Sequence, residues 1–246
     1  MKIALAQVNS VIGDVEFNIQ QHLGLIELAA KQDVNCIFFP ELSLLGYDPN
    51  LAKEMAMELN NKQLDVFETI CKNSNMVIGI GVPSRGTNLE RISMFLFHPN
   101  GERKIYSKQH LYKDESPFFE GGTDPYYLCI NDHKIALAIC YESLVPEHSN
   151  AASDNFSTIY LASVAKSENG VDRVANQYSK IAKSHSMHVL MVNGIGDCGH
   201  FICGGKSSIW NKEGILKGQM NSIEEGIMVW DSDTEIAEII QLEIAV

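Results

Sequence analysis

The chain has 246 residues, of which 45% are hydrophobic and 20% are charged, a composition typical of folded globular proteins and not of disordered ones. Its net charge of −12 repels phosphate backbones and anionic lipid, so we expect neither nucleic acid nor a membrane surface as a partner. No apolar run approaches the roughly 20 residues of a membrane span, and no linker rich in Pro, Gly or Ser divides the chain. We therefore expect a single domain over residues 1–246.

Strands and helices alternate along the chain. The predicted strands, in chain order, lie at 2–8, 36–39, 76–82, 94–97, 104–107, 134–140, 158–164, 189–192, 207–210 and 227–231. The predicted helices, which carry apolar residues at helical spacing, lie at 17–31, 64–71 and 171–182. This alternation indicates an α/β protein in which helices cover the faces of sheets.

One short repeat occurs in the chain. The sequence KIALA stands at 2–6 and again at 134–138, and each copy is followed, after a helical or loop stretch, by a second apolar strand. The repeat arises either by chance in strand-rich sequence or from two halves of the molecule that are related by a pseudo-twofold axis.

The six cysteines are spread through the chain, at positions 36, 71, 129, 140, 198 and 203. Most lie in apolar segments, and their spacing is not that of a secreted disulfide scaffold. The first residues predict a strand and not a signal peptide, because they carry no long apolar region and no small-residue cleavage site. We therefore expect a cytoplasmic protein whose thiols are mostly small buried hydrophobic groups, with Cys36, Cys71 and Cys129 hidden.

Three polar residues follow apolar strands at comparable places. They are Glu41, Lys108 and Cys140. The carboxyl ends of strands in α/β sheets line the ligand crevice, so these side chains can converge. A buried carboxylate can take the proton of a thiol, and an ammonium can stabilise an oxyanion. Taken singly, each has a plainer interpretation: a buried thiol in the core, a glutamate that begins a turn, and a solvated lysine.

Longer segments around these residues carry a family resemblance. Residues 39–47 (FPELSLLGY) resemble the glutamate motif of the nitrilase, or carbon–nitrogen hydrolase, superfamily. Residues 106–111 (YSKQHL) resemble its lysine motif, and residues 139–142 (ICYE) resemble its cysteine motif. The three motifs occur in the family order, and the resemblance spans nearly the whole chain. It implies a single carbon–nitrogen hydrolase domain over 1–246, folded as a four-layer αββα sandwich of the nitrilase type with pseudo-twofold halves.

The resemblance also assigns roles to residues. It implies that Cys140 is the nucleophile, that Glu41 is the general base, and that Lys108 is the amine near the oxyanion. The backbone N–H of Tyr141 would complete the oxyanion site, and Tyr47 of the glutamate motif would lie on the substrate side.

The family uses a second glutamate between its lysine and cysteine motifs. Glu115 is our choice for it, and Glu120 is the alternative. Among the eight histidines, only His110 and His148 lie near the motifs. We expect His110 to pack or to form hydrogen bonds, with Glu41 as the base.

The implied function is cysteine-dependent hydrolysis of non-peptide C–N bonds. The most favoured reaction is that of a small-molecule amidase, which releases ammonia through a thioester intermediate and needs no cofactor. Nitrile or carbamoyl hydrolysis at the same site is an alternative, and so is a catalytically silent or regulatory α/β module. A thiol oxidoreductase is disfavoured because the sequence contains no Cys-x-x-Cys.

Two other patterns were weighed as sites. Cys198, His200 and Cys203 offer three zinc ligands within six residues but no fourth at the usual spacing, so we expect no metal. The segment 204–208 (GGKSS) resembles the end of a phosphate loop, yet His200 stands where that motif needs its first glycine.

The resemblance further implies a homodimer, or a higher homo-oligomer, formed by the packing of two sandwiches. Two apolar segments suit such an interface: the helix at 171–186 and the C-terminal segment 236–246. We expect the C-terminal segment to pack on a sheet edge or on a partner subunit, because an apolar terminus frays unless it is docked.

Overall fold

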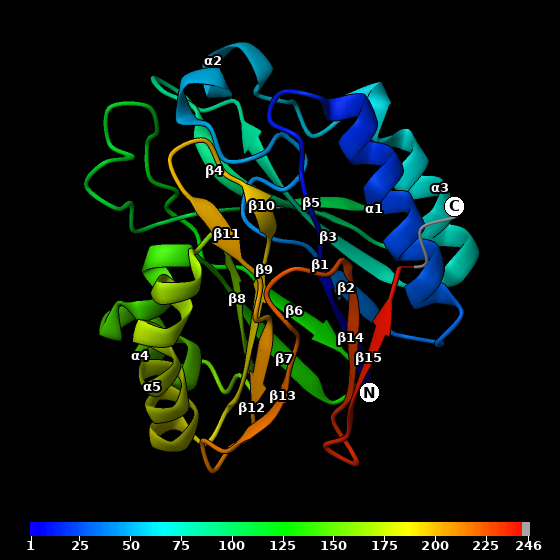
Figure 1. Cartoon of the computed structure of the whole chain (residues 1–246), viewed down its shortest axis with the longest axis vertical. Coiled ribbons are helices and arrows are strands. Elements are labelled where there is room, and N and C mark those ends of the chain that lie inside the picture. The colour runs from blue at the N-terminus through cyan, green and yellow to red at the C-terminus, as the bar shows by residue number, and fades with distance from the viewer. Residues whose placement is uncertain (243–246) are drawn as a thin grey trace.

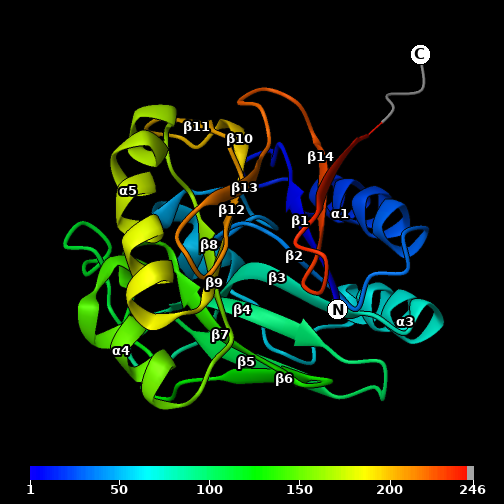
Figure 2. The same ribbon diagram turned by 90° about the horizontal axis from the view of Figure 1, so that it is seen from below.

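Two β-sheets face each other at the centre of the molecule, and a pair of helices covers the outer face of each (Figures 1 and 2). The computed structural model describes residues 1–242. The first sheet contains, in spatial order, β15 (Ala237–Gln241), β14 (Gly226–Asp231), β1 (Lys2–Gln7), β2 (Cys36–Phe38), β3 (Val77–Ser84), β4 (Arg91–Phe97) and β5 (Arg103–Ser107). The second contains β13 (Leu216–Gln219), β12 (Ser208–Trp210), β9 (His188–Asn193), β8 (Ile159–Val164), β7 (His133–Ile139) and β6 (Tyr127–Ile130).

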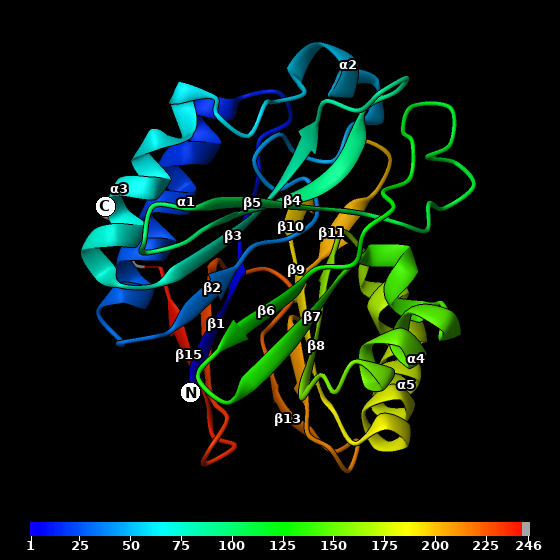
Figure 3. The same cartoon turned by 180° about the vertical axis from the view of Figure 1, so that it is seen from behind.

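The helices form the two outer layers. Helices α1 (Val15–Ala30) and α3 (Asp65–Ser74) lie on the first sheet, and α4 (Pro146–Asp154) and α5 (Glu168–His185) lie on the second. The short α2 (Ala52–Met55) and the long β5–β6 connection extend from one end of the sandwich (Figure 3). A hairpin of β10 (Ile195–Asp197) and β11 (Ile202–Gly204) lies at the same end. Within residues 1–242, short 3-10 helices lie at Pro49–Leu51, Lys62–Leu64 and Cys140–Leu144.

The two halves share one strand arrangement. In the first, β1 and β2 and then β2 and β3 pair in parallel, while β14 pairs antiparallel with β1. In the second, β7 and β8 and then β8 and β9 pair in parallel, while β6 pairs antiparallel with β7. The KIALA segments form β1 and β7, so the pseudo-twofold interpretation of the repeat is confirmed, as is the αββα sandwich.

The repeat has a packing reason. Successive side chains of a strand point to opposite faces of its sheet. Ile3 and Leu5 of β1 therefore enter the core between the two sheets, where Ile135 and Leu137 of β7 meet them. The alanines at 4, 6, 136 and 138 face the helices. Large residues thus fill the space between the sheets, and small residues let the helices approach.

Most predicted elements are present, with boundaries shifted by a few residues. The elements that the sequence did not reveal are α2, α4, β6, β10, β11, β13 and β15. The strands among them have three to five residues, and α4 (PEHSNAASD) carries almost no apolar pattern. Such segments are set by their tertiary neighbours and not by local periodicity.

The two apolar segments suggested for an interface have different outcomes. In α5, Val171, Tyr178 and Ala182 pack on the chain's own second sheet, so that stripe is not available to a partner. Residues 237–241 form β15, which pairs with β14 at the edge of the first sheet, so docking on a sheet edge is confirmed for them. Residues 243–246 lie outside the described residues.

The cysteines also differ in part from the prediction. Cys36 and Cys71 are buried as expected, and burial raises the pKa of Cys71 to about 12. Cys129 is exposed on β6, so the prediction that it is hidden was wrong: β6 is an edge strand, and its side chain points outward. Cys198 and Cys203 form a disulfide across the β10–β11 hairpin, which the sequence analysis did not anticipate. No helix within residues 1–242 is long and apolar enough to cross a membrane.

Gly81 of β3 lies directly against the turn that follows β2. A Cβ atom at this position would lie 2.1 Å from the carbonyl oxygen of Pro40 and 2.6 Å from the amide nitrogen of Leu42. The Leu44 N–H donates a hydrogen bond of 3.0 Å to the Gly81 carbonyl oxygen. The turn at 40–44 therefore rests on a strand that has room only for glycine.

We expect Gly81→Ala to destabilise the fold, because the added methyl group would collide with backbone atoms that cannot rotate away. Overpacking of this kind costs about 1–3 kcal/mol. Thermal denaturation should show a lower melting temperature than that of the wild type. Gly24→Ala in α1 is the control, since its Cβ would come no closer than 3.7 Å to another atom. Equal melting temperatures for Gly81→Ala and the wild type would show that β3 does not support this turn.

Candidate active site

The three polar residues that follow predicted strands come together at one end of the sandwich. Glu41 lies in the turn after β2, Lys108 follows β5, and Cys140 follows β7 directly. Two of these turns contain a non-glycine residue with positive φ, Leu42 at 52° and Cys140 at 49°. Such backbone is uncommon for residues with a Cβ atom and clusters at functional sites.

Lys108 lies between two carboxylates. Its Nζ donates hydrogen bonds to Oε1 of Glu41 at 2.8 Å and to Oε1 of Glu115 at 2.7 Å. All three side chains are buried, and Lys108 has no exposed surface. Burial by itself would lower the pKa of Lys108, but Glu41, Cys140 and Glu115 outweigh it and hold the pKa above its ordinary value. The lysine therefore stays an ammonium.

Glu41 has the properties of a base. Burial raises its pKa, and the charge of Glu115 adds to the rise, while the charge of Lys108 opposes it. Its Oε1 is taken by Lys108, and its Oε2 is buried with no hydrogen-bond partner within residues 1–242. An ionised carboxylate with one uncommitted oxygen beside a thiol can accept the proton of that thiol.

The thiol of Cys140 lies between opposing charges. Burial raises its pKa first and Glu41 raises it further, while Lys166 and Lys108 lower it. Lys166 Nζ lies 3.6 Å from the Sγ atom. Lys166 was not predicted from the sequence, although it follows strand β8 as the other three follow their strands. That position was the signal that could have found it.

The two candidate glutamates lie in different surroundings. Glu115 contacts Lys108, whereas the Glu120 carboxylate accepts hydrogen bonds from the backbone N–H groups of residues 87–89 and pairs with Arg91 at 2.8 Å. Those backbone bonds hold the pKa of Glu120 at about 2. Glu120 therefore orders a surface loop, whereas Glu115 lies beside Lys108.

A cleft of about 590 Å³ opens at Cys140. Its wall includes five aromatic side chains, those of Tyr47, Tyr112, Phe118, Tyr141 and Phe201. The Tyr47 hydroxyl donates a hydrogen bond of 3.1 Å to Glu115, and the Tyr141 ring packs edge-on against Tyr112. The site thus joins a charged floor to an apolar entrance of a size suited to a small molecule.

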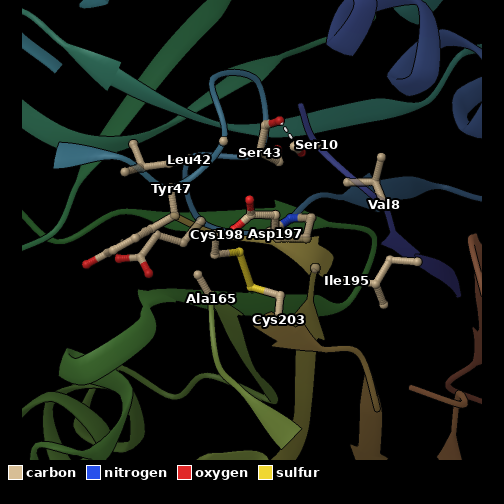
Figure 4. Close-up of a pocket in the computed structure, with 14 residues that line it drawn as sticks. Val8, Ser10, Leu42, Ser43, Tyr47, Ala165, Ile195, Asp197, Cys198 and Cys203 are labelled. Carbon is tan, nitrogen blue, oxygen red and sulfur yellow. Dashed lines mark hydrogen bonds between the residues drawn. A yellow bond between two sulfur atoms is a disulfide. The ribbon is translucent and has the colours of Figure 1, made fainter. Parts of the chain in front are cut away.

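The disulfide hairpin forms one side of this region. Its tip carries His200 and Phe201 into the cleft, and the Phe201 ring lies 5.9 Å from that of Tyr47. Figure 4 shows Tyr47, Ala165 and the Cys198–Cys203 disulfide around a second, smaller cavity of about 20 Å³, room for about one water molecule. Since the two sulfurs are bonded to each other, they are not thiolate ligands for zinc. Within residues 1–242, no group of three His, Cys, Asp or Glu side chains could hold a metal ion.

His110 lies away from the thiol. It lines another cavity together with His148, and the two rings lie 6.2 Å apart. Burial lowers the pKa of His148 to about 4. The His110 backbone N–H donates a hydrogen bond of 3.3 Å to Glu142, and its ring packs edge-on against that of His148.

Glu142 ties the cysteine turn to the lysine turn. Its Oε1 accepts hydrogen bonds from the Ile139 N–H at 2.6 Å and the Tyr106 hydroxyl at 2.7 Å. Its Oε2 accepts from the N–H groups of Gln109 at 2.6 Å and His110 at 3.3 Å. Burial raises the pKa of Glu142 to about 7 against these hydrogen bonds. One carboxylate therefore fixes the backbone just after Lys108 and just before Cys140.

Comparisons with known proteins bear on the family and on the fold. A family model described as carbon-nitrogen hydrolase matches residues 2–241. A glutamine-dependent NAD(+) synthetase of Aquifex aeolicus is 25% identical over 93% of the chain, and an (R)-stereoselective amidase of Pseudomonas sp. is 26% identical over 85% of the chain and 77% of its own length. The chain spans only 41% of the length of that synthetase.

Solved structures share the fold. The NitN amidase of Nesterenkonia sp. AN1 superposes with a TM-score of 0.86 at 22% identity, covering 94% of this chain and 92% of the amidase. A variant of the amidase from the same organism, in complex with butyramide, gives a TM-score of 0.85 at 21% identity, covering 93% of this chain and 89% of the amidase.

We expect Glu142→Gln to lower the melting temperature, because the amide NH₂ would replace an acceptor and face N–H donors. A buried donor left without an acceptor costs about 1–3 kcal/mol. Glu147→Gln is the matched control, since Glu147 is exposed on the next helix. If the melting temperatures of both variants equal that of the wild type, the hydrogen bonds of Glu142 to Ile139 and Gln109 do not stabilise the fold.

Proposed function

The chain belongs to the carbon–nitrogen hydrolase family, and we propose that it is an amidase in which Cys140 attacks the carbonyl carbon of a small amide. The observation that carries the proposal is the buried Lys108 held between Glu41 and Glu115, with the Cys140 thiol at the floor of an adjoining cleft. A thiol, a base and a fixed ammonium are the parts that nucleophilic acyl transfer requires.

In the proposed reaction, Glu41 takes the proton of Cys140 on its free Oε2, and the thiolate attacks the amide carbon. Lys108 and the Tyr141 N–H stabilise the oxyanion of the tetrahedral intermediate. Glu41 returns the proton to the leaving nitrogen, so that ammonia departs and a thioester remains. Glu41 then deprotonates a water molecule, which hydrolyses the thioester. The reaction uses water as its only co-substrate.

The positions of the other groups support this assignment. Glu115 accepts hydrogen bonds from Lys108, from the Tyr47 hydroxyl and, at its Oε2, from the Tyr112 N–H at 2.8 Å. It is therefore a positioning residue that holds Lys108 and the cleft wall. A silent or regulatory module is disfavoured because the whole set of interacting groups is intact. Stoichiometric labelling of Cys140 by iodoacetamide would distinguish the two.

The substrate we propose is a small linear amide, with an ω-amide of a carboxylic acid or a carbamoyl compound among the candidates. Three of the relatives are named glutamine-dependent NAD(+) synthetases, so glutamine belongs in the test panel. Hydrolysis of a nitrile at the same site is the alternative that the panel must also include.

We also propose that the chain forms one functional domain over 1–246 and works as a homodimer in the cytoplasm. Support for the location comes from four free thiols spread through the chain, whereas the Cys198–Cys203 disulfide is a feature more common outside the cytoplasm. Support for the dimer comes from β15, an edge strand that exposes Ile239 beside the exposed Ile236. A second copy can cover such a surface through a twofold axis.

The wild-type protein should release ammonia from members of a panel of small amides, carbamoyl compounds, nitriles and glutamine. Cys140→Ala should abolish release, and Glu41→Gln should lower kcat by about 10²–10⁴, since an amide cannot accept the thiol proton. Cys129→Ala is the matched control, because Cys129 is the exposed free thiol and should leave the rate unchanged.

The pH profile gives a second readout of the same proposal. Because the pKa of Glu41 is raised, the acid limb of kcat/KM should lie above pH 4.5, the ordinary value for a glutamate. Activity retained in Glu41→Gln within a few-fold, with an unchanged acid limb, would assign the base to another group.

Light scattering should give twice the mass of one chain. Ile239→Lys should produce monomers if β15 lies in the interface, whereas Ile223→Lys, also highly exposed, should not. A wild-type monomer at micromolar concentration would contradict the proposed dimer.

A further inference from the structure

We propose that Lys166 is a second catalytic ammonium, which stabilises the thiolate of Cys140 both when it attacks and when it leaves. The inference rests on the proposed function in one respect, the assignment of Cys140 as the nucleophile. It adds a residue that the three sequence motifs do not contain.

The contact between the two side chains is direct. Lys166 Nζ donates a hydrogen bond of 3.6 Å to Sγ of Cys140. Within residues 1–242, Lys166 forms no ion pair with a carboxylate inside 4.0 Å, whereas Lys108 forms two. An ammonium that is largely removed from water needs a counter-charge, and within residues 1–242 the Cys140 sulfur is the hydrogen-bond partner of this one.

The backbone of Lys166 is built to hold this position. The buried side chain of Asn193 accepts a hydrogen bond from the Lys166 N–H at 2.9 Å and donates one to the Lys166 carbonyl oxygen at 2.9 Å. The Gly204 N–H donates a further bond of 2.9 Å to the same carbonyl. These three hydrogen bonds fix the backbone of Lys166. Its side chain extends from the end of β8 to the Cys140 thiol.

The charged side chains around the Cys140 sulfur sum to zero net charge. Glu41 and Glu115 supply two negative charges, and Lys108 and Lys166 supply two positive charges. Lys108 is shared between both carboxylates, so Lys166 is the cation left to compensate the sulfur. Transfer of the thiol proton to Glu41 neutralises one carboxylate and creates one thiolate, and the sum of charges in the cluster does not change.

This balance bears on two steps of the reaction. In the first, the S–H proton passes to Glu41 and the sulfur electron pair forms the S–C bond, so the negative charge moves from sulfur to the carbonyl oxygen. In the last, water adds to the thioester and gives its proton to Glu41. The S–C bond then breaks, and its electron pair returns to the sulfur. Lys166 faces the thiolate before the first bond forms and after the last one breaks.

The pKa shifts of Cys140 and Lys166 agree with this geometry. Lys166 and Lys108 both lower the pKa of the Cys140 thiol, against burial, Glu41 and Glu115, which raise it. In return Cys140, Tyr178 and Glu41 hold the pKa of Lys166 above its ordinary value, despite the burial that would lower it. The lysine therefore remains charged while the thiol titrates.

The test measures the rate of Cys140 alkylation by iodoacetamide as a function of pH, which needs no substrate and no turnover. The background is Cys129→Ser, which removes the exposed free thiol. We expect Lys166→Met to raise the apparent pKa of the thiol and to slow alkylation at pH 7 at least about tenfold, since a cation within ~4–6 Å shifts a pKa by about 1–3 units. Lys166→Arg should stay closer to the wild type because it keeps the charge.

Lys206→Met is the matched control. Lys206 lies on the turn after β11, where its Nζ pairs with Asp172 at 2.9 Å and Glu168 at 3.0 Å. This variant should keep the wild-type alkylation profile. Thermal melts of each variant confirm that the proteins compared are folded.

Three outcomes would contradict either the proposed role of Lys166 or the assignment of Cys140 as the nucleophile. A folded Lys166→Met variant with the wild-type iodoacetamide profile would remove Lys166 from the chemistry. Loss of reactivity toward iodoacetate alone, with iodoacetamide unaffected, would make Lys166 an anchor for an anionic substrate group and would also overturn the proposal. Failure of the wild-type Cys140 to react ahead of the buried thiols would refute the assignment of the nucleophile itself, which is a different failure.

Discussion

The buried charge of Lys108 is the constraint on which the rest of the site depends. Its ammonium is closed off from water, and the carboxylates of Glu41 and Glu115 compensate it at 2.8 and 2.7 Å. Removal of one partner from a buried pair typically costs about 3–5 kcal/mol. The three side chains come from the turn after β2, from the end of β5 and from the loop that follows, so this cluster holds three backbone segments in a single arrangement.

The surrounding fold holds the backbone of Cys140 in a conformation of positive φ. Cys140 has a φ of 49°, and such conformations cost of order 1–3 kcal/mol. Glu142 accepts a hydrogen bond from Ile139 just before this residue, and the Ser143 hydroxyl donates one of 2.5 Å to the Cys140 carbonyl oxygen just after it. The Ser163 hydroxyl donates to the Phe39 carbonyl oxygen at 2.8 Å and thereby joins the ends of the two sheets. Strain at the thiol is thus held by contacts from both halves of the sandwich.

Much of this arrangement was predictable because it depends on local sequence patterns. Strands buried on both faces give continuous apolar runs, and the polar residues that end them, Glu41, Lys108 and Cys140, are visible against that background. Lys166 was not recognised because a lysine in a loop is usually exposed to solvent. Its role depends on its contact with Cys140, which only the three-dimensional structure shows. The exposure of Cys129 and the pairing of Cys198 with Cys203 depend on sheet edges and on a hairpin of three-residue strands. Such features follow from tertiary contacts and have no periodicity of their own.

The two glutamates of the site differ in a way that separates their chemistry. Glu115 has both oxygens engaged, Oε1 by Lys108 and the Tyr47 hydroxyl and Oε2 by the Tyr112 N–H. Glu41 has one oxygen committed and one free, and burial raises its pKa toward the range in which a carboxylate exchanges protons near neutrality. A carboxylate that already accepts three hydrogen bonds is suited to hold a lysine, and one with an unpaired buried oxygen is suited to move a proton. The same residue type therefore serves two purposes, and the number of donors around each side chain decides which.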